Sequence, residues 1–264
     1  MKTRTFWLMA LALLAVLSGP AAGAGREVEY RAADGTLLKG YLAGGEGVAA
    51  RRPGVLVVHE WWGHNAYARQ RADMLAGLGY AALAVDMYGD GRQADHPEDA
   101  GKFAGAVRKN LPVMKERFLA AFELLRAQPG VDPGRIAAIG YCFGGSVVLE
   151  MARAGIDLKG VASFHGSLGG GGTAQPGQVK ARVLVLNGAD DKFVTAEQIA
   201  AFRKEMEAAG VNYAFINYPG ALHSFTNPDA DTYAKKFNMP VAYHAAADKE
   251  SWAELQRFLA EVFR

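Results

Sequence analysis

The single cysteine of this 264-residue chain lies among glycines and directly after an apolar run. Residues 135–139 precede the hexapeptide Gly140-Tyr141-Cys142-Phe143-Gly144-Gly145. This order is typical of a nucleophile elbow, where a strand turns sharply into a helix and exposes one side chain at the turn. The glycines leave room for the turn, and the backbone of the nucleophile must itself be strained. Cys142 is therefore a candidate nucleophile, although a lone cysteine is often a small buried hydrophobic residue.

A carboxylate and a histidine follow two later apolar runs. Asp190 and Asp191 come after residues 183–186, and His223 comes after residues 213–218. Cys142, Asp191 and His223 then stand in the nucleophile, acid, base order of α/β-hydrolases. In such a triad the thiolate attacks, the imidazole takes and returns the proton, and the carboxylate orients the imidazole. The order predicts a Cys-His-Asp triad, with Asp190 as the alternative acid.

The loop after residues 55–58 contains the sequence His59-Glu60-Trp61-Trp62-Gly63. An oxyanion hole needs two backbone N–H groups, and those of Phe143 and Trp61 are the candidates. Glu60 and the two indoles could line an acyl pocket at the edge of the sheet. The alternative is that the tryptophans pack under the loop as ordinary apolar residues.

A scaffold must bring these distant segments together. Residues 26–32 and 36–42 alternate apolar and polar residues around Asp34-Gly35, which predicts an antiparallel hairpin. Further strands are predicted at residues 54–58, 80–85, 135–139, 159–164, 181–186 and 213–218. Helices are predicted at residues 67–78, 97–128 with a break near Pro112, 146–154, 196–209 and 251–263. We predict an α/β-hydrolase fold, with a mostly parallel central sheet flanked by helices on both faces and its chemistry at the carboxyl ends of the strands.

The first residues have the pattern of a secretory signal peptide. Lys2 and Arg4 precede an apolar run at residues 6–17, and Ala22-Gly23-Ala24 offers small residues for cleavage. A membrane anchor is the alternative, but the run is short against the roughly 20 residues that a span needs. We expect residues 1–24 to be removed and residues 25–264 to form one exported domain, periplasmic or secreted, with no stable membrane insertion.

The composition narrows the class of partner. Residues 1–24 hold two basic residues and no acidic ones, so the rest has 29 − 2 = 27 Lys+Arg against 27 Asp+Glu. This balance gives no reason to expect a nucleic-acid partner. A single cysteine cannot form an internal disulfide, so in an oxidising compartment Cys142 must be buried, paired between chains or used as a thiol.

The chain resembles the dienelactone hydrolase family, in its exported branch, from residue 26 to the end. The resemblance is carried by His59-Glu60-Trp61-Trp62-Gly63, Asp86-Met87-Tyr88, the Cys142 hexapeptide, Gly188-Ala189-Asp190-Asp191-Lys192-Phe193-Val194 and His223-Ser224-Phe225. It implies a triad of Cys142, Asp191 and His223, because the family spacing Gly-x-x-Asp-x-x-Val selects Asp191. It also implies that Glu60 contacts the resting thiol, and that substrate binding moves the cysteine toward the histidine.

The chain departs from the family where the prototype holds the carboxylate of its lactone with two arginines. Those places are Gly89-Asp90-Gly91 and Thr226-Asn227 here. Arg92 could replace the first arginine by a loop shift, whereas Asn227 cannot carry the charge of the second. We therefore expect a neutral ester, lactone or thioester to fit at least as well as a carboxylated lactone. The pocket residues predicted on this basis are Trp62, Tyr88, Arg92, Phe225 and Asn227.

Taken together, the sequence predicts a hydrolase that cleaves a small-molecule carboxylic ester or lactone through an acyl-thiol on Cys142, with no cofactor and no metal. Thioester cleavage or acyl transfer by the same triad is one alternative, and a non-catalytic binding or redox-thiol protein is another. His165 is expected to be a satisfied histidine of the core or rim, and residues 227–231 a loop and helix cap. We expect a monomer or small homo-oligomer.

Overall fold

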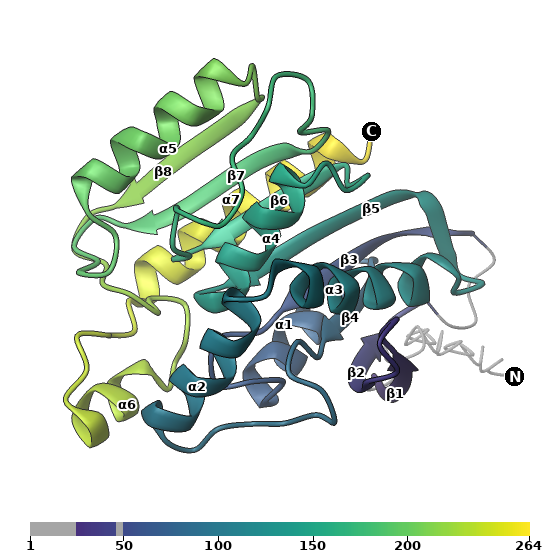
Figure 1. Ribbon diagram of the computed structural model, residues 1–264, viewed down its shortest axis with the longest axis horizontal. Helices are drawn as coiled ribbons and strands as arrows, with labels where there is room; N and C mark the ends of the chain where they lie inside the picture. Colours follow the sequence, from purple (N-terminus) through teal and green to yellow (C-terminus); the bar gives the residue numbers. More distant parts are fainter. Residues whose placement is uncertain (1–24, 46–49) are drawn as a thin grey trace, which may run out of the picture.

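Eight strands form one sheet in the computed structural model, which describes residues 25–45 and 50–264 (Figure 1). β1 (Arg26–Arg31) and β2 (Leu37–Ala43) form the predicted antiparallel hairpin, and β2 pairs antiparallel with β4. The remaining strands, all paired in parallel, are β3 (Arg52–Val58), β4 (Ala81–Val85), β5 (Val131–Tyr141), β6 (Gly160–Phe164), β7 (Arg182–Gly188) and β8 (Tyr213–Tyr218). The order β1-β2-β4-β3-β5-β6-β7-β8 confirms the predicted mostly parallel sheet with an N-terminal hairpin.

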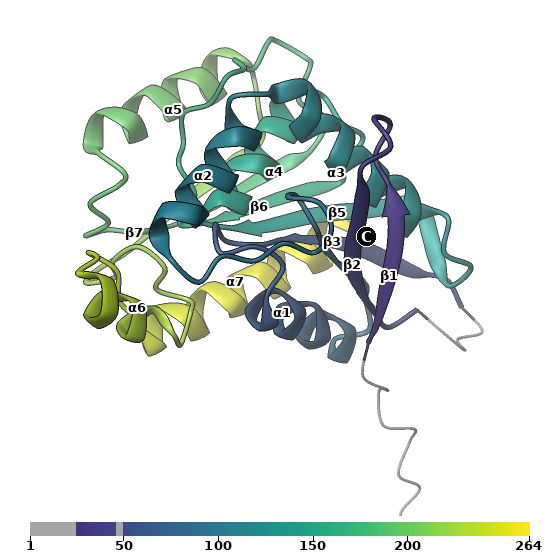
Figure 2. The same ribbon diagram turned by 60° about the horizontal axis from the view of Figure 1, so that its bottom comes forward.

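Helices cover both faces of the sheet. They are α1 (Ala66–Gly77), α2 (Pro97–Arg108), α3 (Leu111–Arg126), α4 (Phe143–Arg153), α5 (Ala196–Ala208), α6 (Ala230–Phe237) and α7 (Ala245–Val262). α3, α4 and α5 lie on one face, and α1 and α7 lie on the other (Figures 1 and 2). β3 alternates between the two cores, with Leu56 and Val58 on the first face and Val55 and Val57 on the second. Burial on both sides is the reason for its continuous apolar run.

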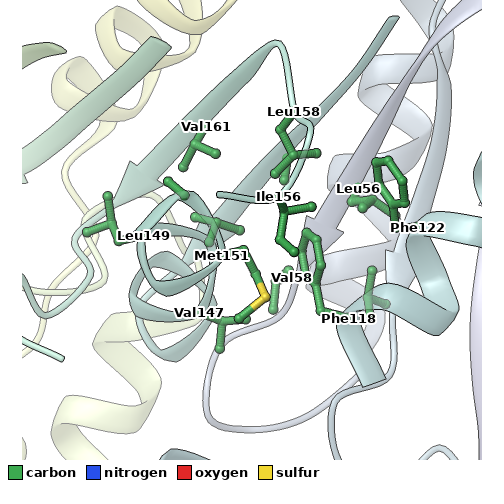
Figure 3. Packing of buried hydrophobic residues seen from close by; sticks show 14 of the residues in the cluster. Leu56, Val58, Phe118, Phe122, Val147, Leu149, Met151, Ile156, Leu158 and Val161 are labelled. Carbon is green, nitrogen blue, oxygen red and sulfur yellow. The ribbon is translucent and has the colours of Figure 1, made fainter. Parts of the chain in front are cut away.

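The core under α3 and α4 holds the elbow in place. Phe118 of α3 packs against Leu56 and Val58 of β3, with Val147 and Met151 of α4 beside them (Figure 3). All of these side chains are less than 3% exposed. Burying such side chains contributes about 1.5–3 kcal/mol each, so the strand before the nucleophile and the helix after it are tightly anchored.

Three helical predictions need correction. The long helix predicted at 97–128 breaks at residues 109–110, because Asn110 caps a new helix by accepting from the N–H of Val113. Pro112 then lies in the first turn of α3, where a missing N–H costs nothing. α4 begins at Phe143, three residues before the predicted start. α7 begins at Ala245, six residues before the predicted start at residue 251. α6 was not predicted as an element.

The parallel strands carry the predicted chemistry to one edge. The carboxyl ends of β3, β5, β7 and β8 lead directly into the segments that hold Glu60, Cys142, Asp191 and His223. The predicted signal peptide lies outside the described residues. None of the helices within the described ranges is long and apolar enough to span a membrane.

Candidate active site

Cys142 stands in a strained turn between β5 and α4. Its backbone has φ of 51° and ψ of −111°, a conformation that non-glycine residues rarely adopt. The neighbouring glycines are required by close approach: a Cβ on Gly140 would lie 2.1 Å from the carbonyl oxygen of Gly144, and one on Gly144 would lie 2.2 Å from that of Val58. The elbow therefore depends on these glycines, as the sequence predicted.

The structure brings Cys142, His223 and Asp191 together in one row. Nε2 of His223 lies 3.0 Å from Sγ of Cys142, and Nδ1 of His223 donates to Oδ2 of Asp191 at 2.8 Å. Oδ1 of Asp191 accepts from the N–H of Phe193, which fixes the carboxylate. Asp190, the alternative acid, is exposed. The geometry selects Asp191 as the partner of the histidine.

The charges around His223 favour its protonated form. Burial by itself lowers the pKa of the ring, but the charge of an ionised Cys142 and the hydrogen bond to Asp191 outweigh burial and raise the pKa to about 10. An imidazole of this kind retains the proton that the thiol gives up. A protonated ring beside a sulfur favours the thiolate, which is the reactive form of a cysteine nucleophile.

A second histidine contacts the backbone of the same cysteine. Nδ1 of His165 accepts from the N–H of Cys142 at 3.1 Å, so its proton is on Nε2, which donates to Oγ1 of Thr226 at 2.8 Å. Burial and the nearby His223 lower the pKa of His165 well below its usual value. His165 is fully buried and hydrogen-bonded, in agreement with the sequence expectation.

The hydrogen bonds continue from His165 into the fold. Thr226 Oγ1 lies 2.6 Å from the hydroxyl of Tyr67 on α1, which also accepts from Nε of Arg71. Arg71 donates to the carbonyl of Thr226 at 2.7 Å and to Asp248 of α7 at 2.6 Å. The loop that carries His223 is thereby tied to two helices on the far face of the sheet.

The carboxylate of Glu60 contacts the loop that follows His223. Its carboxylate accepts from Oγ of Ser224 at 3.0 Å and from Nδ2 of Asn227 at 2.6 Å, whereas the thiol of Cys142 faces His223. Burial raises the pKa of Glu60, and the bonds from Asn227 and Ser224 and the charge of His223 act against that rise. Glu60 thus holds Ser224 and Asn227, which both follow His223 in the loop. The contact of Glu60 with a resting thiol stays a prediction, because the sulfur lies against His223 here.

The loop of the predicted oxyanion hole is fixed through its carbonyl groups. The hydroxyl of Tyr88 donates to the carbonyl of Trp61 at 2.9 Å. Nδ1 of His59 donates to the carbonyl of Glu60, because its Nε2 accepts from the N–H of Met87. Phe143 is the first residue of α4, where a backbone N–H has no acceptor within the helix.

Asp86 organises the segment that holds Tyr88. Its Oδ1 accepts from the N–H groups of Tyr88 and Gly89, and its Oδ2 accepts from those of Gly91 and Lys39. These four bonds explain why a buried carboxylate follows β4. They also place the Tyr88 hydroxyl under the Trp61 carbonyl.

A cavity of about 160 Å³ opens beside the thiol. That is room for roughly ten water-sized groups, enough for a small ester. Of the predicted site residues, Trp61, Trp62, Cys142 and His223 line it. The unpredicted wall residues are Arg108, Ser167, Phe193, Ser224, Tyr233, Met239 and Val241.

Four pocket predictions were wrong. Tyr88 is buried beneath the loop, where its hydroxyl is used by Trp61. Arg92 folds back onto the carbonyls of its own turn, those of Tyr88 and Gly89. Phe225 is fully buried against Tyr218 and His165.

The fourth is Asn227, which is 1% exposed and whose Nδ2 donates to the carboxylate of Glu60. All four residues support the site from behind instead of lining it.

α6 and the segment after it supply much of the missed wall. Tyr233 stacks on Trp62 with ring centroids 4.4 Å apart, and Phe237 lies behind at 6.0 Å. The i, i+4 spacing of these two aromatic residues was a signal for a short helix with one apolar face. No comparable pattern in the sequence indicated that the side chains of Arg108 and Phe193 line the cavity.

The residues of the site are not arranged as metal ligands. Within residues 25–45 and 50–264 there is no group of three or more His, Cys, Asp or Glu side chains that could hold a metal ion.

Comparisons with known proteins identify the family of the chain. The model of the family described as "Dienelactone hydrolase family" matches residues 38–263. A solved structure titled as a dienelactone hydrolase-like promiscuous phosphotriesterase from metagenomic libraries is 35% identical, with a TM-score of 0.81. The match covers 92% of this chain and 100% of that one.

Two curated proteins are also similar to this chain. An uncharacterized protein of Caenorhabditis elegans is 36% identical over 157 residues, which are 57% of this chain and 94% of the relative. A protein of Aquifex aeolicus named "Putative carboxymethylenebutenolidase" is 28% identical over 214 residues, 77% of this chain and 87% of its own. The family match at residues 38–263 spans the segments that hold Cys142, Asp191 and His223.

Proposed function

The chain belongs to the dienelactone hydrolase family and is a hydrolase of carboxylic esters or lactones, and from that premise we propose that it works through an acyl-thiol intermediate on Cys142. The observation that carries the proposal is the row of contacts from Sγ of Cys142 to Nε2 of His223 at 3.0 Å, and from Nδ1 to Asp191 at 2.8 Å. A nucleophile, a base and a carboxylate in hydrogen-bond reach are what acyl transfer requires.

The first half of the reaction forms the acyl-thiol. The thiolate of Cys142 attacks the carbonyl carbon, and the carbonyl oxygen becomes an oxyanion that the N–H groups of Phe143 and Trp61 stabilise. The tetrahedral intermediate then collapses, the C–O bond to the leaving group breaks, and the His223 imidazolium gives its proton to the departing oxygen. The leaving group departs as an alcohol, or stays attached as a hydroxyl when the substrate is a lactone.

The second half releases the acid. Neutral His223 takes a proton from a water molecule, which attacks the thioester carbon, and the same two N–H groups hold the new oxyanion. Collapse breaks the C–S bond and returns a thiolate beside an imidazolium. Asp191 keeps the ring in the tautomer that both halves need.

Glu60 supports this cycle by positioning. Its bonds to Ser224 and Asn227 fix the loop on both sides of Phe225 and Thr226, and so fix the approach of His223 to the thiol. A buried carboxylate near His223 also stabilises the imidazolium. Glu60 thereby acts on the cysteine through the histidine.

The experiment is hydrolysis of aryl esters and lactones by the full chain, with trapping of the intermediate. Rapid quenching during turnover of a phenyl ester should show the mass of one acyl group on the peptide that contains Cys142. Cys142→Ala should abolish both the adduct and turnover. Turnover that persists in Cys142→Ala, or an acyl group on another peptide, would refute the proposal.

We also propose export, on the N-terminal sequence pattern alone. Expression with residues 1–24 present, followed by N-terminal sequencing of the product, tests it. A mature protein that begins at Gly25 is the expected result. Retention of Met1 in the purified protein would refute cleavage.

A further inference from the structure

Three residues around the nucleophile have a strained backbone. Cys142, His165 and Ser224 have φ of 51°, 39° and 57°, a region that non-glycine residues rarely occupy. Such conformations persist only where the surrounding structure fixes them from several sides. Cys142 is the nucleophile, His165 accepts from its N–H, and Ser224 follows the base in the chain. We therefore looked for a group that holds all three segments at once.

Arg71 of α1 is buried behind these segments. It is 4% exposed, and its guanidinium carbon lies 5.4 Å from the ring centroid of Tyr141, the residue before Cys142. Its Nη2 donates to the carbonyl of Thr226 at 2.7 Å, three residues after His223. One side chain thus contacts both the strand end that leads to the nucleophile and the loop that carries the base.

A chain of hydrogen bonds connects the same two segments through side chains. Nε of Arg71 donates to the hydroxyl of Tyr67 at 3.3 Å, and that hydroxyl lies 2.6 Å from Oγ1 of Thr226. Oγ1 accepts from Nε2 of His165 at 2.8 Å, and Nδ1 of the same ring accepts from the N–H of Cys142. Thr226 is therefore held by Arg71 at its carbonyl and, through Tyr67, at its hydroxyl.

We propose that Arg71 is a positioning residue, which sets the approach of Nε2 of His223 to Sγ of Cys142. This deepens the proposed function and rests on it, because only there does the pair exchange a proton with a substrate. Arg71 acts through Thr226 on the side of the base and through Tyr141 on the side of the nucleophile. A displacement of either segment would lengthen the 3.0 Å contact that proton transfer requires.

The charge of Arg71 is compensated by α7, which lies on the same face of the sheet as α1 (Figure 2). Nη2 also donates to Oδ1 of Asp248 at 2.6 Å, and the guanidinium carbon lies 5.2 Å from the ring centroid of Tyr67 and 5.3 Å from a ring centroid of Trp252. A buried ion pair adds little to stability compared with well-packed apolar residues, because desolvation offsets the attraction. A planar guanidinium, however, directs several N–H groups at fixed angles, which suits a positioning role.

A purely structural role for Arg71 is the competing explanation. Its loss would then lower the thermal midpoint and leave the kinetics of the folded protein unchanged. A positioning role predicts a lower kcat with a nearly constant KM, because Arg71, Tyr67 and Thr226 are not among the described wall residues of the cavity. It also predicts that a displaced imidazolium stabilises the thiolate less, so that alkylation of the thiol requires a higher pH.

The first experiment removes one hydroxyl at a time, in Tyr67→Phe and in Thr226→Val, and keeps the shape of each side chain. We expect kcat for a phenyl ester to fall roughly tenfold in each variant. Iodoacetamide reports the thiol without hydrolysis, because Cys142 is the only cysteine; its thiolate forms an S–C bond and iodide leaves. The midpoint of the alkylation rate against pH should rise by about half a pH unit.

Tyr41→Phe is the matched control for these variants. It removes a tyrosine hydroxyl that also bonds to α1, through Asp73, but that belongs to β2 and not to the chain from Arg71 to Cys142. Its kcat and its alkylation midpoint should equal those of the unchanged protein. Unchanged kinetics in both hydroxyl variants, or an equal loss in Tyr41→Phe, would overturn the proposal.

The double variant Tyr67→Phe/Thr226→Val tests whether the two hydroxyls belong to one chain. If they act in series, the double variant should lose no more activity than the more impaired single variant. Losses that multiply would place the two hydroxyls on separate routes and overturn the common anchor.

Arg71→Lys tests the guanidinium itself. Lysine keeps a charge for Asp248 but lacks the planar fork, so kcat should again fall roughly tenfold. Arg153→Lys is the matched change at another buried arginine, which pairs with Glu150 and Glu205 instead. It should lower the thermal midpoint without this change in kinetics, and an equal fall in kcat there would count against Arg71. If Arg71→Lys does not fold, the two hydroxyl variants decide the question.

The two readouts separate this proposal from the proposed function. If no ester is hydrolysed but the alkylation midpoint rises in Tyr67→Phe and Thr226→Val, the proposed function fails and the positioning of His223 against the thiol stands. If esters are hydrolysed but neither kcat nor the midpoint depends on these residues, only the positioning role fails.

Discussion

Two buried histidines flank the nucleophile and have opposite electrostatic character. His223 contacts the sulfur of Cys142, and the pKa of its ring is raised to about 10. His165 contacts the backbone N–H of the same residue, and the pKa of its ring is pushed well below its usual value. The two ring centroids are 5.3 Å apart. Burial is common to both, so the partners must account for the difference.

The partners differ in charge. His223 lies between an ionisable thiol and the carboxylate of Asp191, and both stabilise a positive ring. His165 lies between an N–H that it must accept from and the hydroxyl of Thr226, and neither can stabilise a positive charge. A positive His223 also disfavours a second positive ring beside it. The site thus holds one histidine for proton transfer and one for geometry.

The largest expected effect comes from removing the histidine on the sulfur side. His223→Ala takes away the base, so kcat/KM for a phenyl ester should fall about 10⁴-fold while the thermal midpoint changes little. Steady-state kinetics and a thermal melt measure the two quantities. If His223→Ala kept more than a tenth of the activity, the base would have to be a different group.

Asp191→Asn tests whether the carboxylate causes the difference in pKa between the two histidines. An amide keeps the shape but cannot stabilise the imidazolium, and it favours the wrong tautomer, so kcat should fall about 10²–10³-fold. Asp190→Asn changes the exposed neighbour and is the matched control, with activity close to that of the unchanged protein. Loss of activity in the Asp190 variant alone would reassign the triad acid.

Substitution of His165 should lower activity less than substitution of His223, because His165 positions the nucleophile and does not transfer a proton. His165→Leu removes the acceptor of the Cys142 N–H, although the carbonyl of Phe164 still accepts from that N–H at 3.0 Å. We expect kcat to fall about 10–100-fold, because a small displacement of the nucleophile is costly.

His165→Asn is the rescue variant for that test. Asparagine offers an oxygen near the place of Nδ1 and tolerates the φ of 39° found at residue 165. Most of the activity should return. If Asn and Leu were equally impaired and the activity–pH curve moved, His165 would be part of the proton transfer, and the contrast with His223 would disappear.

Glu60→Gln tests whether the charge of Glu60 also contributes to the protonated form of His223. The change keeps the size of the side chain but removes the charge that favours the His223 imidazolium, and it unbalances the bonds from Ser224 and Asn227. We expect an intact fold and a roughly tenfold lower kcat. Unchanged turnover would mean that Glu60 serves the fold alone.

Much of this site was predictable because it follows the strands. Cys142, Asp191 and His223 each follow a strand that the sequence predicted, and parallel pairing then brings the ends of β5, β7 and β8 to one edge. The hairpin and the alternation of strands and helices were equally clear. Local patterns that repeat along the chain carried this information.

What escaped prediction depends on side-chain direction. Arg92 and Arg108 are both basic residues near helix or turn ends, yet one folds onto the carbonyl of Tyr88 and the other faces the cavity. Asn227 was expected in the pocket and is held behind it by Glu60. Such choices are decided by contacts between segments far apart in sequence, for which single-residue patterns give no signal.

A third buried histidine extends the comparison to stability. His64 is 1% exposed, and neither ring nitrogen has a hydrogen-bond partner among the described residues. Burial, followed by the charges of His59 and Arg69, lowers the pKa of its ring to about 3. Like His165, it has no carboxylate partner within residues 25–45 and 50–264 of the kind that Asp191 provides for His223.

In the unfolded chain the same ring titrates near pH 6.5, so below that pH the unfolded state binds a proton that the folded state does not. The contribution of His64 is therefore complete above pH 6.5 and is lost as the pH falls toward 3, with a limiting slope of about 1.4 kcal/mol per pH unit. His64→Leu should remove that slope from the free energy of unfolding measured by urea titration between pH 6.5 and 4. His96→Asn, which changes an exposed N-cap histidine and keeps a capping oxygen, should leave it in place. If the slope is the same in His64→Leu and in the unchanged protein, His64 must gain a proton partner in the folded state. The lack of a partner would then not be the reason why a buried ring stays neutral here.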